Sequence, residues 1–422
     1  MTVRRFRLSR LLKLVPFLLC LFALYLIGSS MYIAVSSNQP FFRDEFQQID
    51  QEEHHLNEFY TDPEKYYVKF QERSSTAKKN LIIVSHGRSG STLVGDIFNH
   101  HPSVFYMYEP LQTVERVTLT MLGTSKNYNE RAMEFLTGIF RCSFDSPQML
   151  TDIEKFYRKP AHPRVSRAIA SPPLCPYLTT DPRWDPSLCP PMSSESLGSA
   201  CKAHYDLTVI KVLIPRIPEN SIKSILASCM PEDVDCKVIF LVRDPRAVIA
   251  SALSVGFFKE QKGLSKVGTR SFSYLTCKET EHNLDFVRKL PESLRDRIKF
   301  QRYEDLALDP LKELSGLYKF AGLSVLESVR TWLNETTRQS RKACNHEQDG
   351  APATCTKDDA WVAANRWRWM VHPHEIDLIE HYCRHVMTLM GYKPVDRSYE
   401  LLANVETPLF SDDYEAKHWF LH

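Results

Sequence analysis

The chain has 422 residues, of which 43% are hydrophobic and 25% charged, and its formal net charge is +2. This composition is typical of a globular protein and argues against a disordered chain. Residues 1–35 carry five basic residues and no acidic residue, which leaves residues 36–422 with a charge of −3. That remainder has no broad basic field, so the sequence argues against nucleic acid as a partner.

The N-terminus has the pattern of a membrane anchor. Residues 14–35 include no charged residue, and about 20 apolar residues span a bilayer. The basic residues precede this run, so the positive-inside rule predicts a cytosolic tail at 1–13 and a lumenal remainder. A cleaved signal peptide is the alternative, but the apolar run is long for one. We expect 14–35 to be an uncleaved signal-anchor and the polar residues 36–78 to be a lumenal stem.

The cysteines fit an oxidising lumen. Apart from Cys20 in the predicted span, ten cysteines remain, and an even number suggests disulfides. No paired CxxC spacing suggests a zinc site, and we predict no metal. The pairing does not follow from the sequence, although Cys344 and Cys355 form the best local candidate. Asn334-Glu335-Thr336 is the N-glycosylation sequon, with an unused helix-surface asparagine as the alternative.

Beyond the stem, strand-like and helical patterns alternate. The predicted strands are residues 81–85, 104–108, 208–214, 237–242 and 298–303. Such alternation favours an α/β fold with a mostly parallel sheet flanked by helices, which we place at 79–400, followed by a C-terminal tail at 401–422. A helix is expected at 373–390, ended by Gly391. Ligands in such sheets bind beyond the carboxyl ends of the strands.

Residues 145–205 differ from their surroundings, because they hold many prolines, three cysteines and little periodicity. We interpret them as a disulfide-pinned insertion near an acceptor site. A structural excursion far from any chemistry is an equally good interpretation.

The segment 81–92, Leu-Ile-Ile-Val-Ser-His-Gly-Arg-Ser-Gly-Ser-Thr, is the most informative of the chain. A run of strand-forming residues ends at a glycine-bearing loop, and an amphipathic helix follows. Free backbone N–H groups and the helix dipole at such a turn bind phosphate or sulfate. An ATP-binding P-loop needs lysine where Ser91 stands, whereas the cation here, Arg88, lies inside the loop. A plain strand–turn–helix joint is the alternative.

A second strand, turn and helix run from residue 238 to residue 251. Arg243 ends the strand, Pro245 suits a first helical turn, and Ser251 lies two turns further on. An arginine and a hydroxyl at one crevice are suited to grip a second phosphate. We expect Arg246 to be a solvated helix residue.

Together these units resemble the sulfotransferases. Residues 85–92 look like their 5′-phosphosulfate loop, and residues 243–251 look like their 3′-phosphate motif. Glu109-Pro110 matches a further element of the Golgi carbohydrate 6-O-sulfotransferases, which act on galactose, N-acetylglucosamine or N-acetylgalactosamine. Residues 303–306 and 366–368 resemble other recurrent sulfotransferase segments. The resemblance implies a P-loop-like sulfotransferase fold in a type II Golgi membrane protein.

The resemblance also implies 3′-phosphoadenosine 5′-phosphosulfate as donor and in-line transfer of its sulfuryl group to a sugar 6-hydroxyl, without a metal. Arg88 is then expected to hold the 5′-phosphosulfate and to offset charge on the leaving oxygen. Arg243 and Ser251 are expected to bind the 3′-phosphate. The other candidates for donor binding supply close backbone approach, hydroxyls or amides: Gly87, Ser89, Gly90, Ser91 and Thr92.

A base must take the proton of the attacking hydroxyl. Glu109 is the first choice, because apolar neighbours at the end of its strand are expected to raise its pKa; a strand-end carboxylate paired with arginine is the alternative. His86, inside the loop, is the second choice. Arg366 and Arg368 either contact the donor or an anionic glycan, or pack in a helix beside tryptophans.

The leading hypothesis is therefore a carbohydrate sulfotransferase of the Golgi lumen, acting on keratan- or chondroitin-type glycans or on N- or O-glycans, with a homodimer as one possible assembly. A lumenal P-loop-like kinase is the second hypothesis, although the lysine that it needs is missing. A catalytically inactive glycan-binding or scaffold protein is the third.

Overall fold

The structure, a computed structural model, describes residues 77–120, 127–159, 165–231, 233–255, 268–338 and 359–420. All of them belong to the unit that spans Tyr67–His422. The predicted cytosolic tail, the signal-anchor and nearly all of the stem lie outside the described residues, as do Cys20, Cys344 and Cys355. Across the described part of the chain, no helix has the length and apolar character needed to cross a bilayer.

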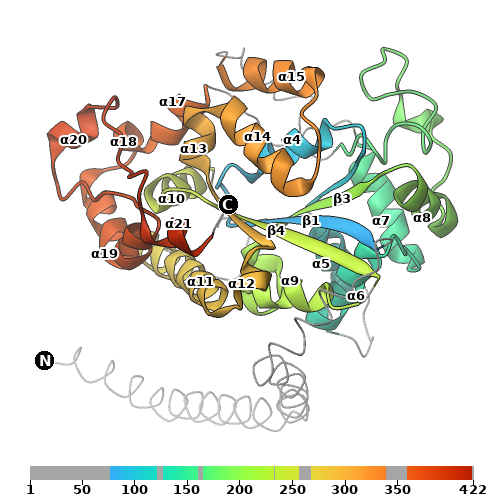
Figure 1. Cartoon of the computed structure of the whole chain (residues 1–422), viewed down its shortest axis with the longest axis horizontal. Helices are drawn as coiled ribbons and strands as arrows, with labels where there is room; N and C mark the ends of the chain where they lie inside the picture. The colour runs from blue at the N-terminus through green and yellow to red at the C-terminus, as the bar shows by residue number, and fades with distance from the viewer. Residues whose placement is uncertain are drawn as a thin grey trace, which may run out of the picture. The chain divides into compact units, whose positions relative to one another are not determined.

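A five-stranded sheet forms the centre of the structure (Figure 1). Its strands, in the order in which they lie side by side, are β2 (Val104–Tyr108), β3 (Leu207–Leu213), β1 (Lys78–Ser85), β4 (Val234–Val242) and β5 (Ile298–Arg302). All neighbouring strands are parallel. The predicted α/β class and the five predicted strands are confirmed, with boundary shifts of up to three residues.

Helices connect these strands and cover both faces of the sheet. They are α4 (Ser91–Asn99), α5 (Leu111–Thr120), α6 (Tyr128–Phe140), α7 (Pro147–Tyr157), α8 (Ser194–Ala203), α9 (Ile222–Ser228), α10 (Pro245–Ser254), α11 (Thr269–Lys289), α12 (Glu292–Arg295), α13 (Tyr303–Leu308), α14 (Pro310–Ala321), α15 (Glu327–Arg338), α17 (Ala360–Asn365), α18 (Trp367–Met370), α19 (Pro373–Leu389), α20 (Tyr399–Ala403) and α21 (Glu415–Trp419), with 3-10 turns η1 (Pro186–Leu188), η2 (Ile214–Arg216) and η3 (Pro218–Asn220).

Burial on both faces explains the strand sequences. In the view of Figure 1, α4 and α14 lie above the sheet, and α6, α9 and α11 lie below it. All seven residues of β3 are buried, as are the last six of β1. Strands covered on both sides read as unbroken apolar runs rather than as alternating patterns, which is why they stand out in the sequence.

The strand register brings the ends of neighbouring strands to one edge of the sheet. Ser85, the last residue of β1, pairs with Leu213 of β3 and Leu241 of β4. On β2, Tyr108 pairs with Lys211 of β3. The loops that follow β1, β2, β3 and β4 therefore begin side by side, as expected for a ligand site in a parallel sheet.

The C-terminal region packs beside β5, the strand at one edge of this sheet. Helix α19 confirms the helix predicted at 373–390 and ends at Leu389, two residues before Gly391, whose φ is 79°. Residues 401–420, which the sequence pattern marks as a tail, contain the end of α20 and the whole of α21. The Phe420 ring stacks on Phe300 of β5, with 5.4 Å between centroids.

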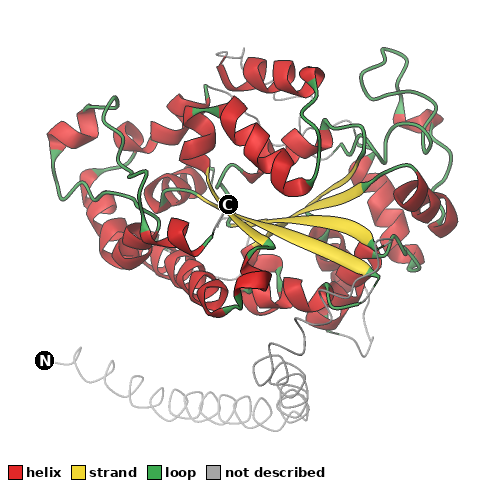
Figure 2. Ribbon diagram, in the orientation of Figure 1, coloured by secondary structure: helices red, strands yellow, loops and turns green. Residues whose placement is uncertain are grey.

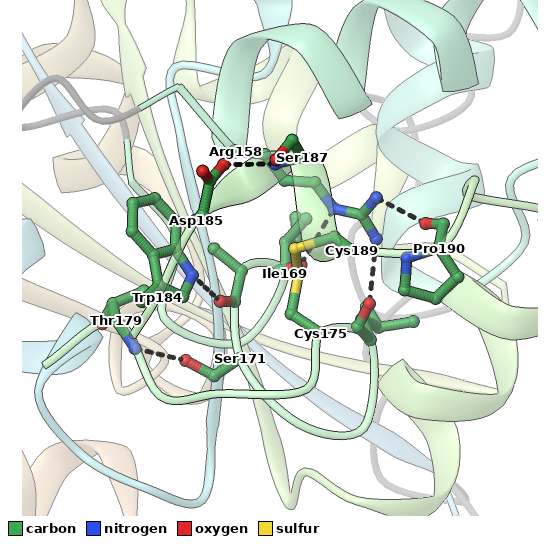
Figure 3. Close-up of a disulfide and its surroundings, with 12 residues drawn as sticks. Arg158, Ile169, Ser171, Cys175, Thr179, Trp184, Asp185, Ser187, Cys189 and Pro190 are labelled. Carbon is green, nitrogen blue, oxygen red and sulfur yellow. Dashed lines mark hydrogen bonds between the residues drawn. A yellow bond between two sulfur atoms is a disulfide. The ribbon is translucent and has the colours of Figure 1, made fainter. Parts of the chain in front are cut away.

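The proline-rich insertion is mostly loop between α7 and α8 (Figure 2). Buried Arg158, just after α7, organises it by donating hydrogen bonds to the carbonyls of Pro190 at 2.7 Å and Leu174 at 3.1 Å. A disulfide joins Cys175 and Cys189 beside these contacts (Figure 3). The predicted disulfide pinning is thus confirmed, whereas the two flanking helices were not expected from the sequence.

The described residues contain four disulfides, which confirms the disulfides predicted from the cysteine count. They are Cys142–Cys201, Cys175–Cys189, Cys229–Cys236 and Cys277–Cys383. The last of them joins α11 to α19, two helices that pack together. Asn334 of the predicted sequon lies in α15 and is half-buried.

Candidate functional site

The loop after β1 has the backbone of an anion cradle. Arg88 and Gly90 are both left-handed, with φ of 71° and 81°. Gly90 immediately precedes α4, so the unpaired N–H groups of the first helical turn begin at this loop. Gly87, Arg88 and Thr92 are partly exposed, whereas Ser89 and Ser91 are buried. The positions of the loop that a ligand can reach from solvent are therefore the glycines, the arginine and the threonine.

Two arginines from distant parts of the sequence meet at this edge. Arg88 Nε donates to Ser251 Oγ at 3.0 Å, and Arg243 Nη1 donates to the Arg88 carbonyl at 2.9 Å. Arg243 Nη2 donates to the carbonyl of Ala363 at 2.6 Å. Burial and the positive charge of Arg243 lower the pKa of Arg88, because both disfavour its charged form. A bound anion would relieve that repulsion.

Tyr303, at the start of α13, packs against the loop. A Cβ on Gly90 would lie only 2.2 Å from Tyr303 Cδ2. The Arg243 guanidinium lies over the same ring, 4.6 Å from its centroid. Gly90 is thus required both by its positive φ and by this ring. The sequence marked 303–306 only as a recurrent segment, since the ring contact depends on β5 lying beside β4.

Buried Glu304 holds the turn that follows Arg243. Its Oε1 accepts a hydrogen bond from the Asp244 backbone N–H at 3.1 Å, and its Oε2 accepts one from the Tyr392 hydroxyl at 2.7 Å. Burial raises the pKa of Glu304. The contact fixes the turn that follows Arg243, and so fixes the place of its guanidinium.

The expectation that Arg246 is solvated is wrong. Its side chain is fully buried, where Nη2 pairs with Asp244 at 2.6 Å and Nη1 pairs with Glu380 at 2.7 Å. The guanidinium also lies 4.3 Å from the Trp367 ring centroid. Two of these partners come from the C-terminal helices, which the local helix pattern around Arg246 does not reveal.

Glu109 is held by cations, not by apolar neighbours. Its carboxylate pairs with Lys211 Nζ, and its Oε2 also accepts from Arg216 Nη1 at 3.0 Å and from Gln112 Nε2. Burial raises the pKa of Glu109, but the positive charges of Lys211 and Arg216 outweigh that effect and lower it. The expected raised pKa is therefore wrong. The alternative of a strand-end carboxylate paired with arginine describes this environment.

Lys211 is a charged residue of this edge that the sequence analysis missed. It sits in the middle of the apolar run of β3, is 2% exposed, and lies 4.2 Å above the Tyr108 ring. Burial lowers the pKa of Lys211, although Glu109 opposes the shift. Tyr108 also interacts electrostatically with Arg88. A lysine inside an otherwise apolar strand is the sequence signal that could have found it.

His86, the second base candidate, faces α11. Its Nδ1 lies 3.8 Å from Glu279 Oε2, and it has a backbone hydrogen bond with Thr276. Burial lowers the pKa of His86 to about 4, so the ring is neutral at physiological pH. Among the described residues, its Nε2 is buried without a hydrogen-bond partner.

Arg366, between α17 and α18, and Arg368, in α18, have different environments. Arg368 is buried and donates to the carbonyls of Asn404 at 2.7 Å and Thr407 at 2.9 Å, and burial lowers its pKa to about 10. Helix packing is thus the correct interpretation of Arg368. Arg366 is partly exposed. Burial raises the pKa of the Tyr303 hydroxyl, and Arg366 lies close enough to oppose that shift, which places it near the loop.

The structure thus brings Arg88, Arg243 and Ser251 together, with His86 in the same loop. Glu109 lies at the end of β2, two strands from β1, which corresponds to roughly 10 Å. Within the described ranges, no cluster of three histidine, cysteine or acidic side chains could hold a metal ion. The assembled groups form a cationic cradle of fixed geometry.

Known proteins share these features. The profile of the family described as "Sulfotransferase domain" matches residues 78–391. Carbohydrate sulfotransferase 1 of Danio rerio is 29% identical over 367 residues, which cover 80% of this chain and 83% of that protein. Carbohydrate sulfotransferase 6 of Homo sapiens is 26% identical over 345 residues, which cover 76% and 82%.

Solved structures align less closely. The sulfotransferase domain from the curacin biosynthetic pathway aligns with a TM-score of 0.41 at 19% identity, over 74% of this chain and 98% of that chain. Mouse sulfotransferase SULT7A1 complexed with PAP aligns with a TM-score of 0.35 at 13% identity, over 80% and 91%. The family profile, in contrast, matches well over half of this chain, from β1 to the end of α19. The chain therefore belongs to the sulfotransferase domain family.

Proposed function

We propose that this protein transfers a sulfuryl group from 3′-phosphoadenosine 5′-phosphosulfate to the 6-hydroxyl of galactose, N-acetylglucosamine or N-acetylgalactosamine in a glycan. The observation that carries the proposal is the contact of the Arg88 loop with Arg243 and Ser251. Two cationic groups held at one edge suit a donor with two separate phosphate groups. The relatives named carbohydrate sulfotransferases support a sugar as acceptor.

The donor fits the two halves of the cradle. Arg88 and the amides that begin α4 would hold the 5′-phosphosulfate, while Arg243 and Ser251 would hold the 3′-phosphate. Gly87 and Gly90 allow the donor to approach the backbone, and Thr92 adds an accessible hydroxyl.

The chemistry asks the protein to position groups and to stabilise charge. As the bond from sulfur to the bridging oxygen breaks, negative charge develops on that oxygen, where the Arg88 guanidinium would offset it. Arg88 is partly buried, which strengthens the interaction relative to water. We assign Glu109 the role of holding Lys211 and Arg216 in place, since its lowered pKa and three hydrogen-bond donors suit it poorly to accept a proton.

We further propose that the protein is a type II membrane protein of the Golgi, with the described unit in the lumen. The charge pattern of residues 1–35 supports this topology. Four disulfides support an oxidising compartment, because thiols stay reduced in the cytosol. Protease protection of the described unit in intact microsomes would test the orientation.

The acceptor position is tested with paired sugars. The full chain is supplied with ³⁵S-labelled donor and with desulfated oligosaccharides that end in galactose, N-acetylglucosamine or N-acetylgalactosamine, each beside its 6-deoxy analogue. We expect label on at least one parent sugar and on none of the 6-deoxy analogues. Equal labelling of a parent sugar and its 6-deoxy analogue would exclude the 6-position.

A further inference from the structure

A second polar cluster lies beside the cradle and is not explained by donor binding. It joins His86 of the loop after β1, Asn220 of the turn after β3, and Glu279 of α11. Strands β1 and β3 are neighbours, so the three groups meet at the same edge of the sheet as Arg88. Only Gly87 separates His86 from Arg88, so the Cα atoms of these two residues lie at most about 7 Å apart.

The carboxylate of Glu279 is held at one oxygen and open at the other. Oε1 accepts a hydrogen bond from Asn220 Nδ2 at 3.0 Å, whereas Oε2 has His86 Nδ1 at 3.8 Å, beyond hydrogen-bond distance. The side chain is 22% exposed. No lysine or arginine of the described ranges forms an ion pair with it. Glu109, in contrast, is 5% exposed and paired with two cations.

The backbone that positions Asn220 is strained and anchored. Glu219 and Asn220 have φ of 59° and 52°, a left-handed backbone conformation that residues other than glycine rarely adopt. Asn283 of α11 holds the turn by donating to the Asn220 carbonyl at 2.9 Å and accepting from the Ile222 N–H at 2.7 Å. Strain of this kind persists where surrounding contacts impose it, and it is frequent at functional sites.

From this arrangement we infer that Glu279 is the proton acceptor of the transfer reaction, with Asn220 and His86 as positioning residues. The inference rests on the proposed sulfuryl transfer. The acceptor hydroxyl oxygen forms a bond to sulfur, and the bond from sulfur to the bridging phosphate oxygen breaks. The electron pair leaves with the adenosine 3′,5′-bisphosphate, and the hydroxyl proton passes to Glu279 Oε2, directly or through one water molecule.

The electrostatics of the cluster agree with this assignment. Burial raises the pKa of Glu279 above its ordinary value, and the hydrogen bond from Asn220 only partly opposes the shift. His86 is neutral above about pH 4, so it places no positive charge beside the carboxylate. A base with a raised pKa holds a proton better during the reaction. The sequence analysis expected a raised pKa of Glu109, whereas in the structure it is Glu279 whose pKa is raised.

The test compares Glu279→Gln with Glu281→Gln in the full chain. Glu281 lies on the same helix with a similar exposed fraction, 24%, and pairs with Lys278. We expect Glu279→Gln to lower the turnover number by about 100-fold or more, the usual contribution of a general base. Its affinity for adenosine 3′,5′-bisphosphate, measured by calorimetry, should stay unchanged. Glu281→Gln should leave both quantities unchanged.

The pH dependence gives an independent readout. In the wild type, turnover should decrease as the pH falls through the raised pKa of Glu279, and this limb should be missing from the residual turnover of Glu279→Gln. Asn220→Gly keeps the left-handed backbone and removes the side chain that donates to Glu279, so it should lower turnover without changing bisphosphate affinity. It also keeps the inference testable if Glu279→Gln does not fold.

Several results would overturn the inference. They are wild-type turnover in Glu279→Gln or Asn220→Gly, an acid limb that persists in Glu279→Gln, or a loss of bisphosphate binding equal to the loss of turnover. Failure of the proposed function is distinguishable, because the wild-type chain would then transfer no sulfuryl group at all.

Discussion

The role of Arg88 follows from the residues that it contacts in the fold. In the sequence it is a cation at an unusual place in a glycine loop. In the structure its Nε contacts Ser251 of α10, and its carbonyl accepts from Arg243. The loop is therefore one half of a cradle whose other half comes from β4, more than 150 residues later. That pairing assigns Arg88 to a donor with two phosphate groups.

Replacing Arg88 should abolish transfer without unfolding the protein. Arg88→Ala removes the cation that offsets charge on the leaving oxygen, and we expect turnover to fall by about 100-fold or more. Arg88→Lys keeps the charge but not the planar fork, so it should recover part of the loss. The matched control is Arg141→Ala, which removes an exposed arginine paired with Asp233. Turnover near wild type in Arg88→Ala would remove Arg88 from the site.

His86 makes a prediction for stability. Burial lowers its pKa to about 4, whereas an unfolded histidine titrates near about 6.5. The native state therefore resists protonation, and its stabilisation is complete above about pH 6.5 and lost as the pH falls towards 4. We expect the free energy of unfolding to decrease by about 2 kcal/mol between about pH 7 and pH 5 from this residue alone.

Urea unfolding of His86→Gln measures this contribution. The variant should lose that part of the pH dependence, whereas His204→Gln, at an exposed position, should keep it. Identical pH dependence in the wild type and His86→Gln would show that His86 does not resist protonation.

At the scale of elements, the edge of the sheet is built from segments that are distant in the sequence. Helix α11 brings Glu279 to the end of β1, α13 brings Tyr303 to Gly90, and the turn after β3 brings Asn220 to α11. Each of these contacts depends on the strand order β2-β3-β1-β4-β5. The parallel register is thus the feature that converts separate motifs into a site.

The insertion between α7 and α8 depends on one buried arginine. Arg158 donates to the carbonyls of Ile169 and Pro190 (Figure 3). It also donates to the carbonyl of Leu174 and pairs with Glu154. Arg158→Ala leaves buried carbonyls without donors, so we expect it to destabilise the insertion by about 3 kcal/mol. Hydrogen exchange should accelerate in residues 165–190 and remain unchanged in β1 and β4.

The exposed Arg183, which pairs with Asp181, supplies the control for this element. Arg183→Ala should leave exchange in the insertion unchanged. If Arg158→Ala gave the same exchange rates as the wild type, the disulfide Cys175–Cys189 would suffice to hold the insertion.

Over the whole molecule, the sequence predicted the strands of the sheet better than it predicted the environments of the side chains at the carboxyl edge of the sheet. The five strands were predictable because strands covered on both faces are continuous apolar runs. The roles of Arg246 and Glu109 were not predictable, because their ion-pair partners, Glu380 and Lys211, come from other elements. Lys211 was hidden inside such an apolar run. Burial, ion pairing and the resulting pKa are properties of the assembled sheet, so motifs alone do not reveal them.

The four disulfides stabilise the fold of the whole described unit. Cys277–Cys383 closes a loop of more than 100 residues that includes β5 and the helices beyond it. In a chain-entropy model, closing a loop of about 100 residues stabilises the folded state by about 4 to 5 kcal/mol. This cross-link ties α19 to α11, the helix that carries Glu279.

The most direct test of the central claim is the transfer of label from donor to glycan by the full chain. The protein is incubated with desulfated glycans and either ³⁵S-labelled 3′-phosphoadenosine 5′-phosphosulfate or γ-³²P-ATP with Mg²⁺. We predict ³⁵S on the glycan and no ³²P on any acceptor. Transfer of ³²P would identify a kinase. Absence of both labels, together with no binding of adenosine 3′,5′-bisphosphate, would indicate an inactive glycan-binding protein and contradict the account.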